Sequence, residues 1–130
     1  MKIVGVGGGT GLPILLGGLK ELNDTGEETL DITAIVTVSD NGGSSGALRD
    51  AFDMPAMGDV RNSIISLACK PALASVFQHR FYRANGFAGH SLGNLVVAAL
   101  YEMNGNFSAA VEQAWKGDPR FEDSHPRRDL

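Results

Sequence analysis

Residues 2–38 carry the pattern that most restricts the fold: two short apolar segments separated by a glycine-rich loop and an amphipathic segment. We expect a first buried strand over residues 2–6. The β-branched run ITAIVTV at 32–38 predicts a second strand that is buried on both faces. Between them, the apolar residues of 12–22 have helical spacing. Strand, helix and strand over this length form a βαβ unit, so the two strands should be parallel.

The rest of the chain carries helical patterns and no further clear strand. Two strands rarely make a stable sheet alone, and the segment 92–103 is apolar on most of its faces. We therefore expect the front part of a larger α/β domain with a parallel sheet, or a chain that completes itself as a homo-oligomer. The five helical segments expected after the second strand are 47–52, 60–69, 71–81, 92–103 and 107–115.

The length of 130 residues suits one domain, to which we assign residues 1–114. The last segment, WKGDPRFEDSHPRRDL at 115–130, is rich in charge, contains two prolines and has no apolar period. A segment of this composition cannot bury enough apolar surface to order itself, so we predict a mostly disordered tail.

Composition excludes several classes of function. The net charge of −4 argues against a general nucleic-acid-binding surface. The single cysteine, Cys69, permits no disulfide within the chain. No apolar run approaches the length of a membrane span, and the apolar run after Lys2 is broken at once by glycines, unlike a signal peptide. We expect a cytoplasmic protein.

The first glycine-rich loop lies between a strand and a helix, where backbone N–H groups and the positive end of the helix favour a phosphate. Glycine lets a ligand approach the backbone closely. Neither the dinucleotide-binding pattern nor the P-loop pattern fits its spacing, and a tight turn with close helix packing is the alternative. The candidate phosphate-binding residues are Gly7, Gly8, Gly9, Thr10 and Gly11.

The second loop, SDNGGSSG at 39–46, follows the second strand and should face the same crevice. Asp40 occupies a position where an acidic residue often meets a ribose hydroxyl, and it is also a candidate Mg²⁺ ligand. The alternative is that Asp40 and Ser44 only cap a helix. The remaining candidate ligand contacts in this loop are Asn41, Gly43, Ser44 and Ser45.

Two further loops precede helices. GDVRN at 58–62 offers Arg61 and Asn62, with Arg61 either contacting phosphate or forming an ion pair. GHSLG at 89–93 matches the nucleophile elbow of serine hydrolases, but the residues before it do not form a strand, which that elbow requires. We therefore interpret it as a loop at a helix start that offers His90, Ser91 and Asn94, with Ser91 as a cap. Four such loops favour a large polar ligand with several anionic groups, such as a nucleotide diphosphate.

The motifs GGGTGL, ITAIVTVSDNGGSSGALRD, GDVRN and GHSLGNL resemble, in order and spacing, the gluconeogenesis-factor (YvcK-like) family, relatives of the 2-phospho-L-lactate transferase CofD. The resemblance covers residues 2 to about 114. It implies a three-layer, Rossmann-like α/β protein of the bacterial cytoplasm. It also implies binding of nucleotide-sugars such as UDP-N-acetylglucosamine, with roles in carbon metabolism and cell shape.

The transferase relatives imply an alternative function, a Mg²⁺-dependent transferase that acts on a nucleotide diphosphate conjugate. Asn41 stands where the family commonly has aspartate, which disfavours a metal held by paired carboxylates. Family members are also more than twice as long, and the departure at residue 115 resembles a truncation or a shifted reading frame. The favoured hypothesis is a regulatory nucleotide-sugar-binding protein without catalytic residues or a required cofactor. A folded remnant without function is the third reading.

Overall fold

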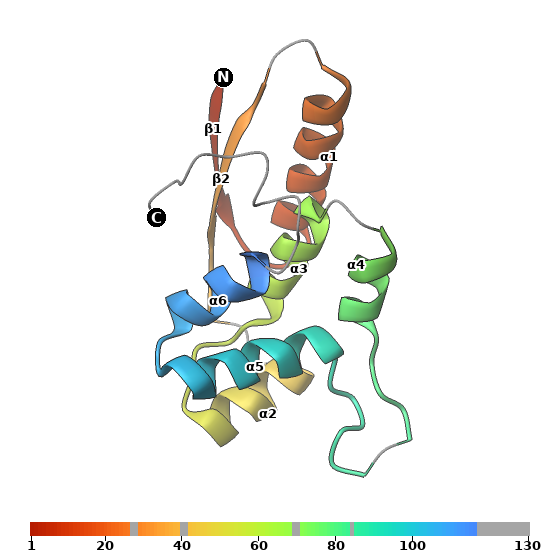
Figure 1. Ribbon diagram of the computed structural model, residues 1–130, viewed down its shortest axis with the longest axis vertical. Helices are drawn as coiled ribbons and strands as arrows, with labels where there is room; N and C mark the ends of the chain where they lie inside the picture. Colours follow the sequence, from red (N-terminus) through yellow and green to blue (C-terminus); the bar gives the residue numbers. More distant parts are fainter. Residues whose placement is uncertain (27–28, 40–41, 69–70, 84, 117–130) are drawn as a thin grey trace.

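The computed structural model describes residues 1–26, 29–39, 42–68, 71–83 and 85–116. Within these ranges the chain is an α/β protein with two strands and six helices (Figure 1). The elements are β1 (Lys2–Gly7), α1 (Gly11–Thr25), β2 (Asp31–Val36), α2 (Gly43–Phe52), α3 (Gly58–Leu67), α4 (Pro71–Gln78), α5 (Leu92–Asn104) and α6 (Phe107–Lys116). None of the described helices is long and apolar enough to span a membrane.

The predicted βαβ unit is confirmed. β1 and β2 pair in parallel, with Lys2 opposite Asp31 and Gly7 opposite Val36. The backbone N–H of Thr37 continues the ladder by donating to the carbonyl of Gly7 at 2.9 Å. Helix α1 makes the crossover between the strands (Figure 1). Both loops that leave the carboxyl ends of the strands therefore start at the same end of the sheet.

The prediction that both faces of the strands are buried was wrong for the described part of the chain. Helices α1 and α3 pack on the sheet, and the face that they cover includes Gly5, which lies close enough to α1 that an added Cβ would be 3.0 Å from Leu12 Cδ1. On the opposite face Val4, Val6 and Ile35 are 60%, 72% and 56% exposed. Apolar strand residues predict a sheet that is covered on both faces. No described element covers this second face.

The main core lies beyond the carboxyl ends of the strands, where α2, α5 and α6 pack together (Figure 1). Helix α5 supplies Val97 and Ala98, both almost fully buried, and its end is set by Gly105, whose left-handed backbone (φ 65°) suits glycine. The broad apolar surface of the 92–103 segment is thus covered from two sides. The buried cluster consists of Leu48, Met54, Met57, Val97 and Ala98.

Some helix boundaries differ from the predicted ones. Helix α2 begins at Gly43 rather than at residue 47, because Gly42 is extended (φ −77°, ψ 140°) and the chain turns into the helix directly after it. Helix α4 ends at Gln78, where the chain leaves to form a bridge between Arg80 and Ser91. The predicted tail begins too early, because helix α6 includes residues 115 and 116. The rest of that segment, residues 117–130, lies outside the described ranges.

Candidate functional site

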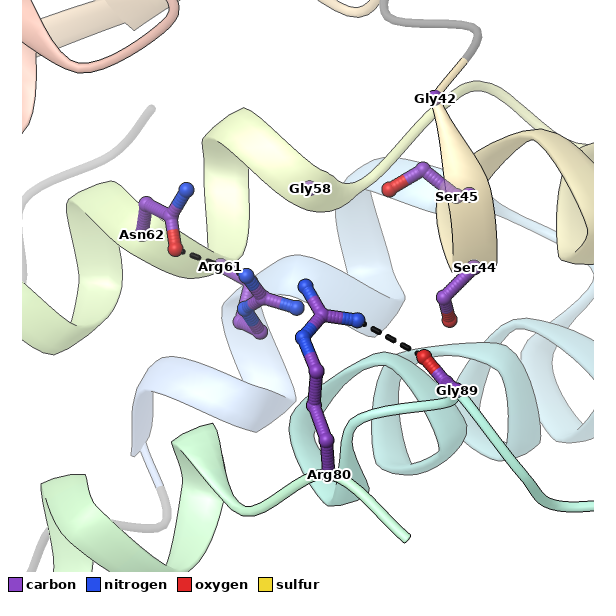
Figure 2. A pocket seen from close by; sticks show the side chains of 9 residues that line it. Gly42, Ser44, Ser45, Gly58, Arg61, Asn62, Arg80 and Gly89 are labelled. Carbon is purple, nitrogen blue, oxygen red and sulfur yellow. Dashed lines mark hydrogen bonds between the residues drawn. The ribbon is translucent and has the colours of Figure 1, made fainter. Parts of the chain in front are cut away.

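A cavity of about 310 Å³ lies between the start of α2, the first turns of α3 and the segment that joins α4 to α5 (Figure 2). Its wall combines small residues, which leave backbone exposed to the cavity, with two arginines from different elements. Three of the four loops predicted to contact ligand contribute to this wall. The lining residues are Gly42, Gly43, Ser44, Ser45, Gly58, Arg61, Asn62, Arg80 and Gly89.

The start of α2 forms one wall of the cavity. Ser44 and Ser45 are 7% and 4% exposed and belong to the first turn of the helix. The first N–H groups of a helix have no carbonyl partner within the helix and carry its positive partial charge. The N-cap is Gly42, whose missing side chain cannot cap those groups. This wall is therefore suited to an anion.

Arg61 forms the wall contributed by α3. Its side chain is almost fully buried (7% exposed), and three of its hydrogen bonds go to the side chains of Ser91, Asn94 and Asn62. Nη1 donates to Ser91 Oγ at 2.6 Å and to Asn94 Oδ1 at 2.9 Å, and Nη2 donates to Asn62 Oδ1 at 2.8 Å. These three bonds fix the orientation of the guanidinium. The structure thus holds a positive charge rigidly at the cavity.

Ser91 and Asn94 stand behind this wall rather than on it. They are 0% and 1% exposed and neither lines the cavity. The predicted cap is confirmed, because Ser91 Oγ accepts from the backbone N–H of Asn94 at 3.1 Å. The amide Nδ2 of Asn94 donates to Ser44 Oγ at 3.0 Å, and Ser44 Oγ lies 2.8 Å from His90 Nδ1. One network of hydrogen bonds therefore joins α2, α3 and α5.

Arg80 is the cavity residue that sequence reasoning missed, together with the backbone of Gly42, Gly58 and Gly89. It lies in the segment between α4 and α5, and its Nη1 donates to the carbonyl of Gly89 at 2.8 Å (Figure 2). Backbone bonds between Phe81 and His90 and between His79 and Leu92 close this segment into a loop. Arg80 belongs to no recognisable local motif in the sequence. Only the closure of this loop shows that it faces the cavity.

The first glycine-rich loop does not line this cavity. Gly8 packs tightly against two side chains: an added Cβ would lie 2.6 Å from both Thr37 Oγ1 and Asp59 Oδ2. Thr37 Oγ1 in turn donates to Asp59 Oδ2 at 3.4 Å. Because Asp59 directly follows the cavity residue Gly58, the loop approaches the start of α3 from the sheet side. Of the other predicted residues, Gly7 ends β1, Gly11 begins α1, and Gly9 and Thr10 lie between them. None of them lines the cavity.

Replacing Gly8 with alanine should therefore disturb the junction between this loop and α3. The new methyl group would displace the side chains of Thr37 and Asp59, and overpacking of this kind costs about 1–3 kcal/mol. Urea unfolding of the variant measures the loss. Gly11→Ala is the matched control, because nothing lies within 4 Å of its Cβ position. Equal stability of the two variants would show that the contacts of Gly8 are not structural constraints.

Asp40 and Asn41 lie outside the described residues, so their predicted contacts with sugar, ribose or Mg²⁺ stay predictions. Within the described ranges there is no group of three or more His, Cys, Asp or Glu side chains that could hold a metal ion. Asp59 is the carboxylate beside the first loop, and the hydroxyl of Thr37 accompanies it.

A parallel βαβ unit with glycine-rich loops beyond the carboxyl ends of its strands defines the Rossmann-like class of α/β proteins, whose ligands bind at that end of the sheet. Residues 3–116 match the family model described as 2-phospho-L-lactate transferase CofD. The chain belongs to this family.

Among its relatives are proteins named gluconeogenesis factor. The one from Halalkalibacterium halodurans is 48% identical over 116 residues, which make up 88% of this chain and 34% of the relative. The one from Bacillus subtilis is also 48% identical over 116 residues, 88% of this chain and 35% of the relative. The chain thus spans about a third of the length of these relatives.

The crystal structure of protein BH3568 from Bacillus halodurans has the same fold. It superposes with a TM-score of 0.80 at 48% sequence identity, covering 91% of this chain and 37% of that chain. The α/β fold expected from the sequence is therefore confirmed at the level of a solved relative.

Proposed function

We propose that this chain binds the diphosphate of a nucleotide-sugar, such as UDP-N-acetylglucosamine, and acts as a regulatory protein of carbon metabolism and cell shape in the cytoplasm. The observation that carries the proposal is the cavity, where Arg61 and Arg80 meet the start of α2. Two guanidinium groups and a helix N-terminus each favour a phosphate. A phosphate between the two guanidinium groups would be attracted by both of them.

The size of the cavity limits which part of the ligand it holds. Pockets for whole ligands usually span about 300–1,000 Å³, and 310 Å³ is at the lower end of this range. We therefore assign the diphosphate and part of one neighbouring group to the cavity. The remainder extends past the start of α3, toward the first glycine-rich loop.

The regulatory role is supported by the names of the relatives, which are gluconeogenesis factors in two Bacillus-type organisms. The second candidate is a Mg²⁺-dependent transferase acting on a nucleotide diphosphate conjugate, and the description of the family model favours it. The two are separated by turnover: a Mg²⁺-dependent release of nucleotide that is lost in Asp40→Ala supports the transferase. Stabilisation by the ligand without turnover supports the regulator.

Arg80→Ala should weaken ligand binding about 10- to 100-fold, because a hydrogen bond to a charged partner contributes about 1.5–3 kcal/mol. Arg83→Ala is the matched control, since Arg83 is an exposed arginine in the same segment that does not line the cavity. Thermal unfolding with UDP-N-acetylglucosamine at millimolar concentration measures both. A ligand at about 100 times its dissociation constant adds about 2.7 kcal/mol to the stability. Equal loss of stabilisation in the two variants would indicate a general charge effect and would contradict the assigned site.

A further inference from the structure

A serine and a histidine meet at the edge of the cavity. Ser44 is the second residue of α2 and lines the cavity, and its Oγ lies 2.8 Å from Nδ1 of His90. Ser44 is 7% exposed and His90 is half-buried. A hydroxyl within hydrogen-bond distance of an imidazole nitrogen is the arrangement in which histidine activates serine as a nucleophile.

The surrounding network fixes the orientation of the Asn94 amide beside this pair. Arg61 Nη1 donates to Asn94 Oδ1, which fixes the amide of Asn94 with its nitrogen toward Ser44. Asn94 Nδ2 therefore donates to Ser44 Oγ. Ser44 Oγ also lies 2.8 Å from His90 Nδ1, and it donates to that nitrogen in the tautomer whose hydrogen is on Nε2. In that tautomer, His90 Nδ1 is the atom that can take the hydroxyl proton. The donor from Asn94 also stabilises negative charge on Oγ as the proton leaves.

We propose that Ser44 is a nucleophile toward phosphorus and that His90 is its general base. The substrate class, a phosphoric anhydride, rests on the proposed function, because Arg61 and Arg80 line the same cavity. In the step, Ser44 Oγ forms a bond to phosphorus and the bond from phosphorus to the bridging oxygen breaks. The hydroxyl proton passes to His90 Nδ1, the leaving phosphate takes the electron pair of the broken bond, and Ser44 becomes a phosphate ester. The guanidinium groups and the start of α2 offset the charge that develops.

This assignment differs from the nucleophile elbow that the motif GHSLG suggests. The serine of that motif, Ser91, is 0% exposed and caps α5, so it is not accessible to a substrate. The histidine of the same motif instead approaches Ser44, which lies 46 positions away in the sequence. Only the packing of α2 beside α5 brings the two groups together.

Labelling with a fluorophosphonate probe tests the proposal without any nucleotide. Attack by Ser44 would form the Oγ–phosphorus bond, release fluoride and pass the proton to His90. Peptide mass spectrometry should locate the label at Ser44, and the labelling rate should fall about 100-fold or more in His90→Asn and vanish in Ser44→Ala. Added imidazole should restore part of the rate in His90→Ala, an effect that a merely structural histidine would not show. Ser66→Ala, in α3 and away from the cavity, is the control and should label like the unmodified chain.

Labelling of Ser44 no faster than that of Ser66 would overturn the proposal, as would an unchanged rate in His90→Asn. If the His90 variants do not fold, the unmodified chain decides: its Ser44 must react at least about 100 times faster than in the urea-unfolded chain. The result is separable from ligand binding. Stabilisation by UDP-N-acetylglucosamine without labelling would overturn the nucleophile and leave the binding proposal intact. Labelling without stabilisation would support the nucleophile and contradict the binding proposal.

Discussion

Replacing Gly93 with alanine should destabilise the protein by about 3 kcal/mol, the upper part of the range for overpacking. Gly93 is the second residue of α5 and is buried against α4 and α3. An added Cβ would lie 2.6 Å from Phe77 Cδ1, 2.8 Å from the carbonyl oxygen of Phe77 and 2.9 Å from Arg61 Cδ. A backbone oxygen cannot turn aside as a flexible side chain can, so α5 must shift. The shift would also move Arg61, and ligand binding should weaken together with stability.

Thermal and urea unfolding of Gly93→Ala measure this loss, which for a domain of this size lowers Tm by about 3–5 °C per kcal/mol. Gly18→Ala is the matched control, because Gly18 lies within α1 and nothing lies within 4 Å of its Cβ position. Alanine in a helix is favoured over glycine by about 0.8–1 kcal/mol, so this variant should become more stable. A Gly93→Ala protein as stable as the Gly18→Ala protein would show that the close contact of α5 with Phe77 is not a constraint.

Asn94→Ala should cost about 2–4 kcal/mol. The side chain is 1% exposed, accepts from Arg61 and donates to Ser44, so its loss leaves a buried guanidinium and a buried hydroxyl each without one partner. A buried polar group that loses a partner costs about 1–3 kcal/mol, and more when it is charged. Asn94 does not line the cavity, but it holds Arg61 and Ser44, which do. The variant should therefore also bind ligand more weakly.

The control for this variant is Asn104→Ala at the end of the same helix. Asn104 is exposed. The hydrogen bonds that its side-chain amide donates to the carbonyl of Leu100 and to Gln113 Oε1 lie on the surface. Removing exposed hydrogen bonds of this kind should change the stability by less than about 0.5 kcal/mol. Urea unfolding of both variants, with calorimetric titration of UDP-N-acetylglucosamine, separates the two effects. A small and equal effect of the two substitutions would mean that the buried network does not hold the cavity wall.

The local part of the fold could be predicted from the sequence because it depends on short-range patterns. Glycines between two β-branched runs defined the βαβ unit, and apolar spacing located all six described helices to within a few residues. Ser91 was recognised as a cap because Ser at a helix start has a direct physical role. Three of the four loop motifs, those at 39–46, 58–62 and 89–93, also contain most of the residues that line or support the cavity.

The rest depends on contacts between distant segments. Arg80 faces the cavity only because the chain after α4 folds back onto Ser91, and no local pattern encodes that return. Arg61 lines the cavity, whereas Asn94 is buried behind it. The sequence marks both as polar residues but does not show which of them is accessible to a ligand. The exposure of Val4 and Val6 was missed for a different reason: apolar composition predicts that a strand face is covered, without saying which polypeptide covers it.

The most direct test of the account is amide-resolved NMR of the ¹⁵N-labelled chain titrated with UDP-N-acetylglucosamine. Saturable shifts should be largest at the backbone amides that line the cavity, those of 42–45, 58, 61–62 and 89. They should be weak in Arg80→Ala and unchanged in Arg83→Ala. Shifts confined to the exposed sheet face around Val4 and Val6, or a folded chain whose spectrum does not respond at millimolar ligand, would contradict a phosphate site between α2, α3 and Arg80.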